Sequence, residues 1–173
     1  MRHVSPVAVG EAEEREEAPR ARQESEGGAA TFKEPLGEQA SVRPKRILVV
    51  EDDPTINDII TLLLSSEGYA VTPAFSAQEA LEALRKETFD LVTLDLALGE
   101  RDGREILREV KSDPKLRSIP VLVVSAYTGW LTPEERRMAS GILEKPFDVE
   151  DLVQRVRTLI GPSGESAEES TER

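Results

Sequence analysis

The most informative stretch of the sequence is Ile47-Leu48-Val49-Val50-Glu51-Asp52-Asp53-Pro54. Its first four residues form a short apolar run, which is typical of a β-strand buried on both faces of a parallel sheet. Three acids and a proline end the run, and apolar residues then recur at helical spacing at Ile56, Ile59, Ile60 and Leu63. The stretch therefore predicts a buried strand that leads through an acidic turn into an amphipathic helix.

The same alternation of strand and helix signals continues from residue 45 to residue 161. Four further apolar runs predict strands: Tyr69–Thr72, Leu91–Leu94, Pro120–Val124 and Ile142–Leu143. Apolar residues at helical spacing lie between these runs and after the last of them. Five strand–helix units predict a doubly wound α/β domain, (βα)5, with helices on both faces of one parallel five-stranded sheet.

Local signals mark the ends of several predicted helices. Gly68 can end the first helix, because glycine readily adopts the left-handed conformation found after a helix. Asp148 is expected to cap the last helix. Two pairs fit the capping box, in which each residue bonds the backbone of the other: Ser76 with Glu79, and Thr132 with Glu135.

Composition limits the classes of protein that the chain can belong to. The 173 residues contain no cysteine, which excludes disulfides, thiolate metal sites and cysteine nucleophiles. The net charge of −12 disfavours direct binding of nucleic acid. No apolar run is long enough for a membrane span or a signal peptide, so we expect a cytoplasmic protein with no membrane contact.

The two ends of the chain differ from its middle. Residues 1–44 are rich in glutamate and their few apolar residues show no period, so we expect a disordered acidic extension. Residues 162–173 are rich in serine, glutamate and glycine, and we expect a disordered tail. The domain is therefore expected to span residues 45–161.

Polar side chains follow four of the predicted strands. Glu51 and Asp52 follow the first strand, Asp95 the third, Ser125 the fourth and Lys145 the fifth. The carboxyl ends of parallel strands meet at one edge of the sheet, where ligands of such folds bind. Carboxylates brought to about 4 Å repel by roughly 4 kcal/mol at an effective dielectric constant near 20, so the edge favours a cation.

Oxygen ligands without imidazole or thiolate suit Mg²⁺, with Mn²⁺ as an alternative, and both ions often share a phosphate. A hydroxyl and an ammonium opposite the acids would suit phosphoryl oxygens, and a carboxylate can accept a phosphoryl group. Each residue alone also has a plainer interpretation. Asp52 or Asp53 could cap a helix, Ser125 could be an ordinary strand-end hydroxyl and Lys145 a solvated lysine.

In three stretches the chain resembles the receiver family of response regulators in two-component signalling. The first stretch is the strand with its acids, residues 47–54, and the second is Leu94-Asp95 with Asp102-Gly103 after it. The third set is Ser125-Ala126 with Lys145-Pro146-Phe147. The resemblance covers residues 46–160 and implies a flavodoxin-like fold with strand order 2-1-3-4-5.

The resemblance also implies a role for each site residue. Asp95 would accept the phosphoryl group, and Ser125 and Lys145 would contact it. Mg²⁺ would be held by Glu51, Asp52, Asp95 and the backbone carbonyl of Ala97. The Lys145–Pro146 peptide is expected to be cis.

The sequence departs from the family pattern in three places. Leu98-Gly99 replaces the usual Met-Pro of the acceptor loop, which residues 94–103 resemble, and Ile142 replaces an aromatic residue that flips inward on activation. The segment from Ser125 to Lys145 is also short, which puts the fourth helix in doubt. Tyr127 and Trp130 lie in this segment and either pack on the domain or form the element that meets a partner.

The leading functional interpretation is a phosphoacceptor that receives its phosphoryl group from a sensor histidine kinase or a histidine phosphotransfer protein. The signal would then pass to an unknown downstream protein by direct contact. Such a chain is not an enzyme, apart from Mg²⁺-dependent self-phosphorylation and autodephosphorylation.

Two alternatives remain open at this point. One is a receiver-like binding module that is never phosphorylated. The other is a phosphatase of the haloacid dehalogenase type, since residues 51–55 superficially resemble its Asp-x-Asp-x-Thr motif. That motif needs an aspartate nucleophile at its first position, where this chain has Glu51.

Overall fold

The computed structural model describes residues 43–99 and 101–164. The expected extension and tail therefore fall largely outside the described residues. The elements in chain order are β1 Arg46–Val50, α1 Pro54–Ser66, β2 Ala70–Ala74, α2 Ala77–Lys86, β3 Leu91–Leu94, β4 Ala97–Leu98, β5 Arg101–Asp102, α3 Gly103–Ser112, β6 Val121–Ser125, η1 Thr128–Trp130 (a 3₁₀ helix), α4 Pro133–Met138, β7 Gly141–Glu144 and α5 Val149–Ile160.

Five strands form one parallel sheet in the order β2-β1-β3-β6-β7. Because β6 and β7 are its fourth and fifth strands, this order is the predicted 2-1-3-4-5 and confirms the doubly wound fold. The sequence did not predict the short antiparallel pair β4–β5, which lies in the loop between β3 and α3.

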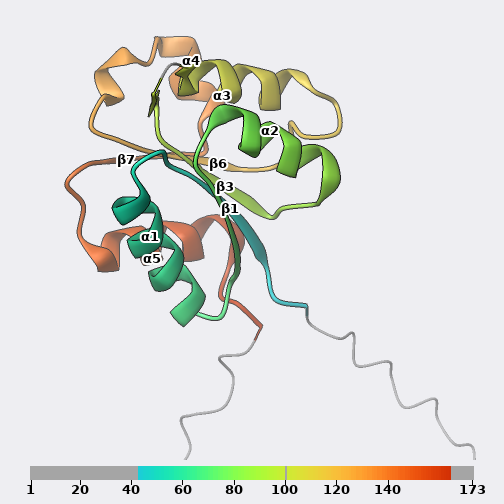
Figure 1. Cartoon of the computed structure of the whole chain (residues 1–173), viewed down its shortest axis with the longest axis vertical. Coiled ribbons are helices and arrows are strands. Elements are labelled where there is room, and N and C mark those ends of the chain that lie inside the picture. Colours follow the sequence, from blue (N-terminus) through green and yellow to red (C-terminus); the bar gives the residue numbers. More distant parts are fainter. Residues whose placement is uncertain (1–42, 100, 165–173) are drawn as a thin grey trace, which may run out of the picture. The chain divides into compact units, whose positions relative to one another are not determined.

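The helices cover the sheet on two sides (Figure 1). Helices α1 and α5 pack on one face, against a layer that includes Ile47, Val49 and Leu143. Helices α2 and α3 pack on the other face, against a layer that includes Leu48, Val50 and Val123. Successive strand residues thus alternate between two buried layers, which explains why the strands are continuously apolar.

Most of the predicted caps are present. Gly68 follows α1 with φ of 86°, in the left-handed region, and Thr132 and Glu135 form the complete capping box of α4. Two predictions were partly wrong. Glu79 bonds the backbone N–H of Phe75 instead of that of Ser76, and Asp148 occupies the N-cap position of α5 without making a side-chain cap bond.

Some boundaries also differ from the sequence-based expectation. Strand β2 begins at Ala70, and the preceding Tyr69 is buried and donates its hydroxyl to the carbonyl of Gly161 at 2.8 Å. Pro120 lies just before β6, and its carbonyl accepts a hydrogen bond from Val92. Ser163 is buried and bonds the carbonyl of Gly68, so packing continues beyond residue 161.

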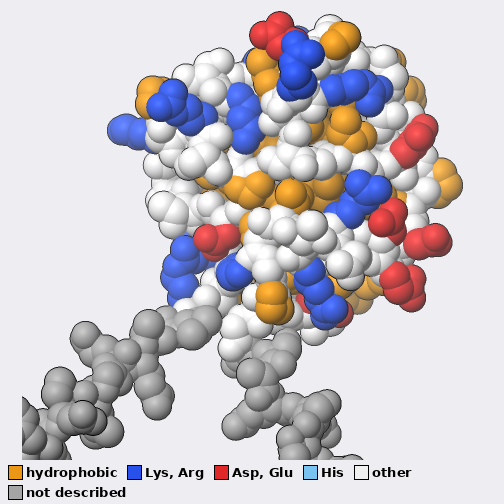
Figure 2. All heavy atoms as spheres, turned by 180° about the vertical axis from the view of Figure 1, so that it is seen from behind, with side chains coloured by type: hydrophobic (Ala, Val, Ile, Leu, Met, Phe, Trp, Pro, Cys, Tyr) orange, Lys and Arg blue, Asp and Glu red, His pale blue; other side chains and the backbone are white. Residues whose placement is uncertain are grey.

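Both signs of charge are present on the surface of the domain. Figure 2 shows lysine and arginine side chains spread over one face, with acidic side chains gathered mainly along one margin. None of the helices in the described residues has the length and apolar character needed to cross a membrane.

Candidate functional site

Strand register brings the predicted site residues to one edge of the sheet. Val50 is paired with Leu94, so the residues that follow them, Glu51 and Asp95, leave the sheet at the same level. Ser125 is paired with Glu144, which precedes Lys145. Carboxylate oxygens of Glu51, Asp52 and Asp95 all lie within 4.8 Å of one another. The edge therefore carries a compact cluster of three acids.

Lys145 reaches into this acidic cluster. Its ammonium nitrogen donates a hydrogen bond to Oδ2 of Asp95 at 3.0 Å and another to Oε2 of Glu51. The lysine side chain is only 14% exposed, and Glu51 and Asp95 are buried. The peptide bond between Lys145 and Pro146 is cis, as the resemblance implied. One ammonium thus faces three carboxylates, which leaves an excess of negative charge.

Burial and neighbouring charge shift the pKa values of two of these groups. Desolvation raises the pKa of Glu51, and the charge of Asp95 adds to this effect, while the bond from Lys145 opposes it. Burial disfavours the charged form of Lys145, but its bonds to Glu51 and Asp95 outweigh burial and raise its pKa. A divalent cation would relieve the remaining repulsion, so the donor set fits Mg²⁺.

The backbone on both sides of Asp95 is closely fixed. Its N–H continues the sheet by donating to the carbonyl of Val50 at 3.0 Å, and its Oδ1 accepts from the N–H of Ala97 at 3.3 Å. Gly103 packs so tightly that a Cβ atom there would lie 2.1 Å from the carbonyl oxygen of Asp95. The assignment of the Ala97 carbonyl as a metal ligand stays a prediction.

The acceptor loop explains one departure from the family pattern. Gly99 has φ of 56°, a conformation closed to proline, whose ring holds φ near −65°. A proline at this position is therefore incompatible with this loop. The preceding side chain, Leu98, is buried in the core.

Asp53 caps a helix, which is the plainer interpretation considered for it from the sequence. Its Oδ1 accepts hydrogen bonds from the N–H groups of Thr55 and Ile56 at 2.8 and 3.1 Å, so it caps α1. Asp53 is not a member of the acidic cluster formed by the described residues. Asp52 is exposed and belongs to that cluster.

Ser125 ends β6 and is bonded to the aromatic turn, residues 127–130. The serine is fully buried, and its Oγ accepts a hydrogen bond from the N–H of Tyr127 at 3.1 Å. The rings of Tyr127 and Trp130 stack with centroids 4.3 Å apart, and the two residues are 47% and 46% exposed. Both aromatic residues therefore pack mainly on each other and remain accessible.

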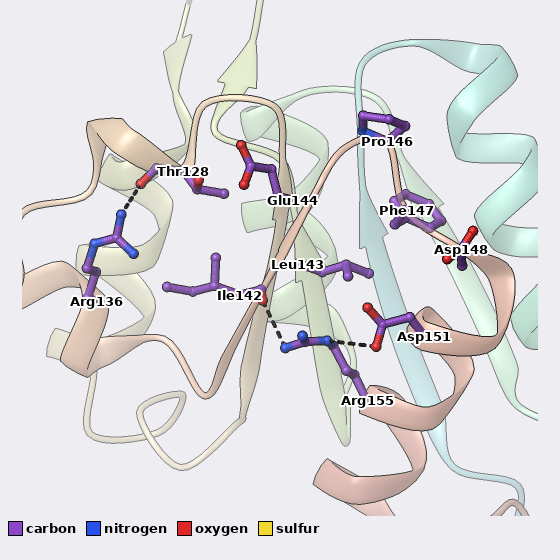
Figure 3. Close-up of a pocket in the computed structure, with 10 residues that line it drawn as sticks. All are labelled: Thr128, Arg136, Ile142, Leu143, Glu144, Pro146, Phe147, Asp148, Asp151 and Arg155. Atoms are coloured by element: carbon purple, nitrogen blue, oxygen red, sulfur yellow. Dashed lines mark hydrogen bonds and ion pairs between the residues drawn. The ribbon is translucent and has the colours of Figure 1, made fainter.

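Ile142 lines a groove next to the aromatic turn. The groove has a volume of about 510 Å³, and its lining includes Thr128, Ile142 and Glu144. Figure 3 shows Arg136 and Arg155 on either side of Ile142. Arg136 donates to the carbonyl of Thr128 at 2.8 Å, and Arg155 donates to that of Ile142 at 2.9 Å. The groove is open to solvent and distinct from the acidic cluster.

Two residues near the site were missed by sequence reasoning. Asn57 is fully buried and bonds the carbonyl of Glu51. Arg104 bonds Asp102 in the acceptor loop and the carbonyl of Trp130 at 2.9 Å. Asn57 carried a weak signal, because it is a polar residue on the apolar side of a helix. Arg104 carried none, because its contact joins segments far apart in sequence.

One known protein family matches nearly the whole of the α/β domain. Residues 47–157 match the family described as the response regulator receiver domain. This match covers more than half of the chain. The protein therefore belongs to the response regulator receiver family.

Individual relatives agree with this assignment. The chain is 38% identical to an uncharacterized 14.6 kDa protein of Leptolyngbya boryana, with 64% of this chain and 86% of the relative covered. It is 34% identical to the DNA-binding dual master transcriptional regulator RpaA of Synechocystis, with 66% of this chain covered. The chain spans only 48% of RpaA and 24% of the regulator ZraR of Klebsiella oxytoca.

Solved structures also resemble the domain. The response regulator TrrA of Thermotoga maritima, determined in complex with Mg²⁺ and BeF, is 30% identical and has a TM-score of 0.61, with 66% of this chain and 98% of TrrA covered. A CheY-like receiver domain of Methanospirillum hungatei is 30% identical with a TM-score of 0.59, and the match covers 66% of this chain and 92% of that domain.

Proposed function

We propose that the protein is a phosphoacceptor that takes a phosphoryl group on Asp95 from a sensor histidine kinase or a histidine phosphotransfer protein. The main support for this proposal is the position of the Asp95 carboxylate, which is hydrogen-bonded to Lys145 and lies beside two further acids. A carboxylate oxygen of Asp95 forms the new bond to phosphorus while the bond from phosphorus to the donor nitrogen breaks. The donor imidazole leaves with the electron pair of that bond.

The other residues of the edge have distinct roles in this proposal. Lys145 already bonds Oδ2 of Asp95, so its ammonium lies where it can meet phosphoryl oxygens. Ser125 can turn its hydroxyl toward the same oxygens. Glu51, Asp52 and the carbonyl of Ala97 would help to hold Mg²⁺, with Mn²⁺ as a substitute. When bound, the ion neutralises charge on the carboxylates and the phosphoryl group.

The outcome of phosphorylation, in this proposal, is a changed surface for a downstream protein. Phosphorylation adds roughly −1.5 to −2 of charge and three acceptor oxygens at Asp95. A hydrogen bond from Ser125 to these oxygens would disturb the hydrogen bond that the N–H of Tyr127 donates to Ser125. The aromatic turn would then rearrange. With Ile142 in place of an aromatic residue, Tyr127 and Trp130 are the large side chains nearest in sequence to Ser125.

The proposal places the protein in the cytoplasm, without direct contact to membrane or nucleic acid. Some relatives are named as DNA-binding or transcriptional regulators, but this chain spans only part of their length. Beyond self-phosphorylation and autodephosphorylation, no turnover of a substrate is expected. Two features support this proposal over a phosphatase: Glu51 is buried against Lys145, and Asp53 caps a helix.

Intact-mass measurement after incubation with acetyl phosphate and Mg²⁺ tests the proposal. The wild type should gain the mass of one phosphoryl group, and Asp95→Asn should gain none. Asp53→Asn is the matched control, because it changes an acid of the same edge that lies outside the cluster. A wild type that stays unmodified would favour a binding module, and labelling that survives Asp95→Asn would contradict the assignment of the acceptor.

A further inference from the structure

Asn57 is a buried polar residue on the side of α1 that packs against the sheet. The residue is 0% exposed, although the helix presents polar side chains to solvent at neighbouring positions. Burying a side-chain amide is unfavourable unless its hydrogen bonds are made, so the partners of Asn57 indicate why the residue is tolerated there.

Both amide hydrogens of Asn57 form hydrogen bonds to backbone carbonyls at the edge of the sheet. Nδ2 donates to the carbonyl of Glu51 at 2.9 Å and to the carbonyl of Ala74 at 3.1 Å. Oδ1 accepts from the hydroxyl of Thr61, one helical turn later, at 3.2 Å. Because the hydroxyl of Thr61 donates to Oδ1, Nδ2 stays turned toward the two carbonyls.

The two carbonyls belong to the ends of neighbouring strands. Ala74 is the last residue of β2, and its carbonyl also accepts from the N–H of Glu51 at 3.1 Å. The carbonyl of Glu51 belongs to the peptide group that links Glu51 to Asp52. Asn57 therefore fixes the orientation of the peptide between the two acids that face Asp95.

We infer that Asn57 is a positioning residue of the acidic site: its amide holds the Glu51–Asp52 peptide so that both carboxylates face Asp95. This inference rests on the proposed function of the site. Mg²⁺ demands near-ideal octahedral geometry with ligands at about 2.0–2.1 Å, so a small rotation of this peptide moves ligand oxygens out of range. Loss of a residue that orients metal ligands typically costs about 10- to 100-fold in metal affinity.

A purely structural role would have a different signature. If Asn57 only satisfied two buried carbonyls, its loss would lower the free energy of unfolding and leave the Mg²⁺ affinity of the folded domain unchanged. The two roles are separated by measuring Mg²⁺ dissociation constants by calorimetry and, on Mg²⁺-free samples of the same variants, stability by urea unfolding.

Asn57→Leu, made in the 173-residue chain, replaces the amide by an apolar side chain of similar size. We expect its Mg²⁺ dissociation constant to rise at least tenfold. The matched control is Leu64→Ala, since Leu64 is equally buried on the same helix and packs only in the core. Leu64→Ala should lower stability as well but keep the dissociation constant within about twofold of the wild type, because no site peptide depends on it.

Each outcome decides the inference. A folded Asn57→Leu with wild-type affinity would overturn it and leave the proposed function intact. A wild type that binds no Mg²⁺ at millimolar concentration would remove the proposed metal site and the positioning role with it. If Asn57→Leu does not fold, Asn57→Ala decides, since it removes the same two bonds from the amide with a residue that favours the helix and adds no apolar bulk. A rise in its dissociation constant would support the inference, and an unchanged constant would overturn it.

Discussion

The acidic edge and the aromatic turn are held in different ways, although only Ala126 separates Ser125 from Tyr127. At the edge, buried Glu51 and Asp95 are tied to Lys145. In the turn, Tyr127 and Trp130 stack on each other and are nearly half exposed. Arginines reach two carbonyls of the turn from its surface.

This difference fits the proposed function, in which the edge takes the phosphoryl group and the turn meets a partner. Phosphoryl transfer needs groups held within a fraction of an ångström, which buried and charge-assisted bonds provide. Communication with a partner needs a segment that can change at low energetic cost, which exposed stacking and surface bonds allow. Ser125 accepts a hydrogen bond from the turn and ends β6 at the same edge of the sheet, so in the proposed function it is the residue that would couple the two regions.

Gly103→Ala should have the largest effect of the variants proposed here, a loss of stability caused at the acidic edge. The added Cβ would lie 2.1 Å from the carbonyl oxygen of Asp95 and 2.8 Å from the Cα of Leu96, so the backbone that follows Asp95 would have to shift. We expect a loss of about 2–4 kcal/mol in the free energy of unfolding, measured by urea denaturation. Gly129→Ala in the aromatic turn is the control, because its Cβ would enter open space. Equal losses for both variants would contradict the contrast in rigidity.

Asp52→Ala should act on the edge without affecting the packing of the core. Asp52 is exposed, so removal of its carboxylate costs little stability but takes a ligand from the proposed Mg²⁺ site. We expect the Mg²⁺ dissociation constant to rise tenfold or more, and the rise in melting temperature that Mg²⁺ gives the wild type to be largely lost. Undiminished stabilisation of the variant by Mg²⁺ would show that the ion binds elsewhere.

The sequence determined the fold and the acidic edge because both follow from local patterns and topology. Apolar runs such as Leu91–Leu94 predict buried strands, and parallel strands bring their polar ends to one edge. The β4–β5 pair was missed because strands of two residues carry no periodic signal. The contact from Arg104 to Trp130 was missed because it depends on how α3 meets the aromatic turn in space.

The coupling between the two regions predicts a spectroscopic change. Trp130 is the only tryptophan in the chain, so its emission reports on the aromatic turn alone. Acetyl phosphate or beryllofluoride, each with Mg²⁺, should shift this emission in the wild type, and Ser125→Ala should reduce the shift by half or more. Asp95→Asn is the negative control. Constant emission while mass spectrometry shows phosphorylated Asp95 would exclude the turn as the responding element.

Deletion of residues 1–40 should have the smallest effect. The segment lacks a periodic apolar face that could pack on the domain, so it should stabilise neither region. We expect the melting temperature to stay within about 2 °C of the value for the undeleted chain in differential scanning calorimetry. A drop of several degrees would mean that the segment docks on the domain.

A crystal structure of the 173-residue chain with Mg²⁺ and beryllofluoride would test the assignment of Asp95 most directly. We expect beryllofluoride bonded to a carboxylate oxygen of Asp95, with Lys145 and Ser125 bonded to its fluorines and Mg²⁺ beside Asp52. The contact from Tyr127 to Ser125 should be changed relative to its present length of 3.1 Å. Beryllofluoride on another acid, or an occupied Asp95 without contact to Lys145, would contradict the assignment of the site.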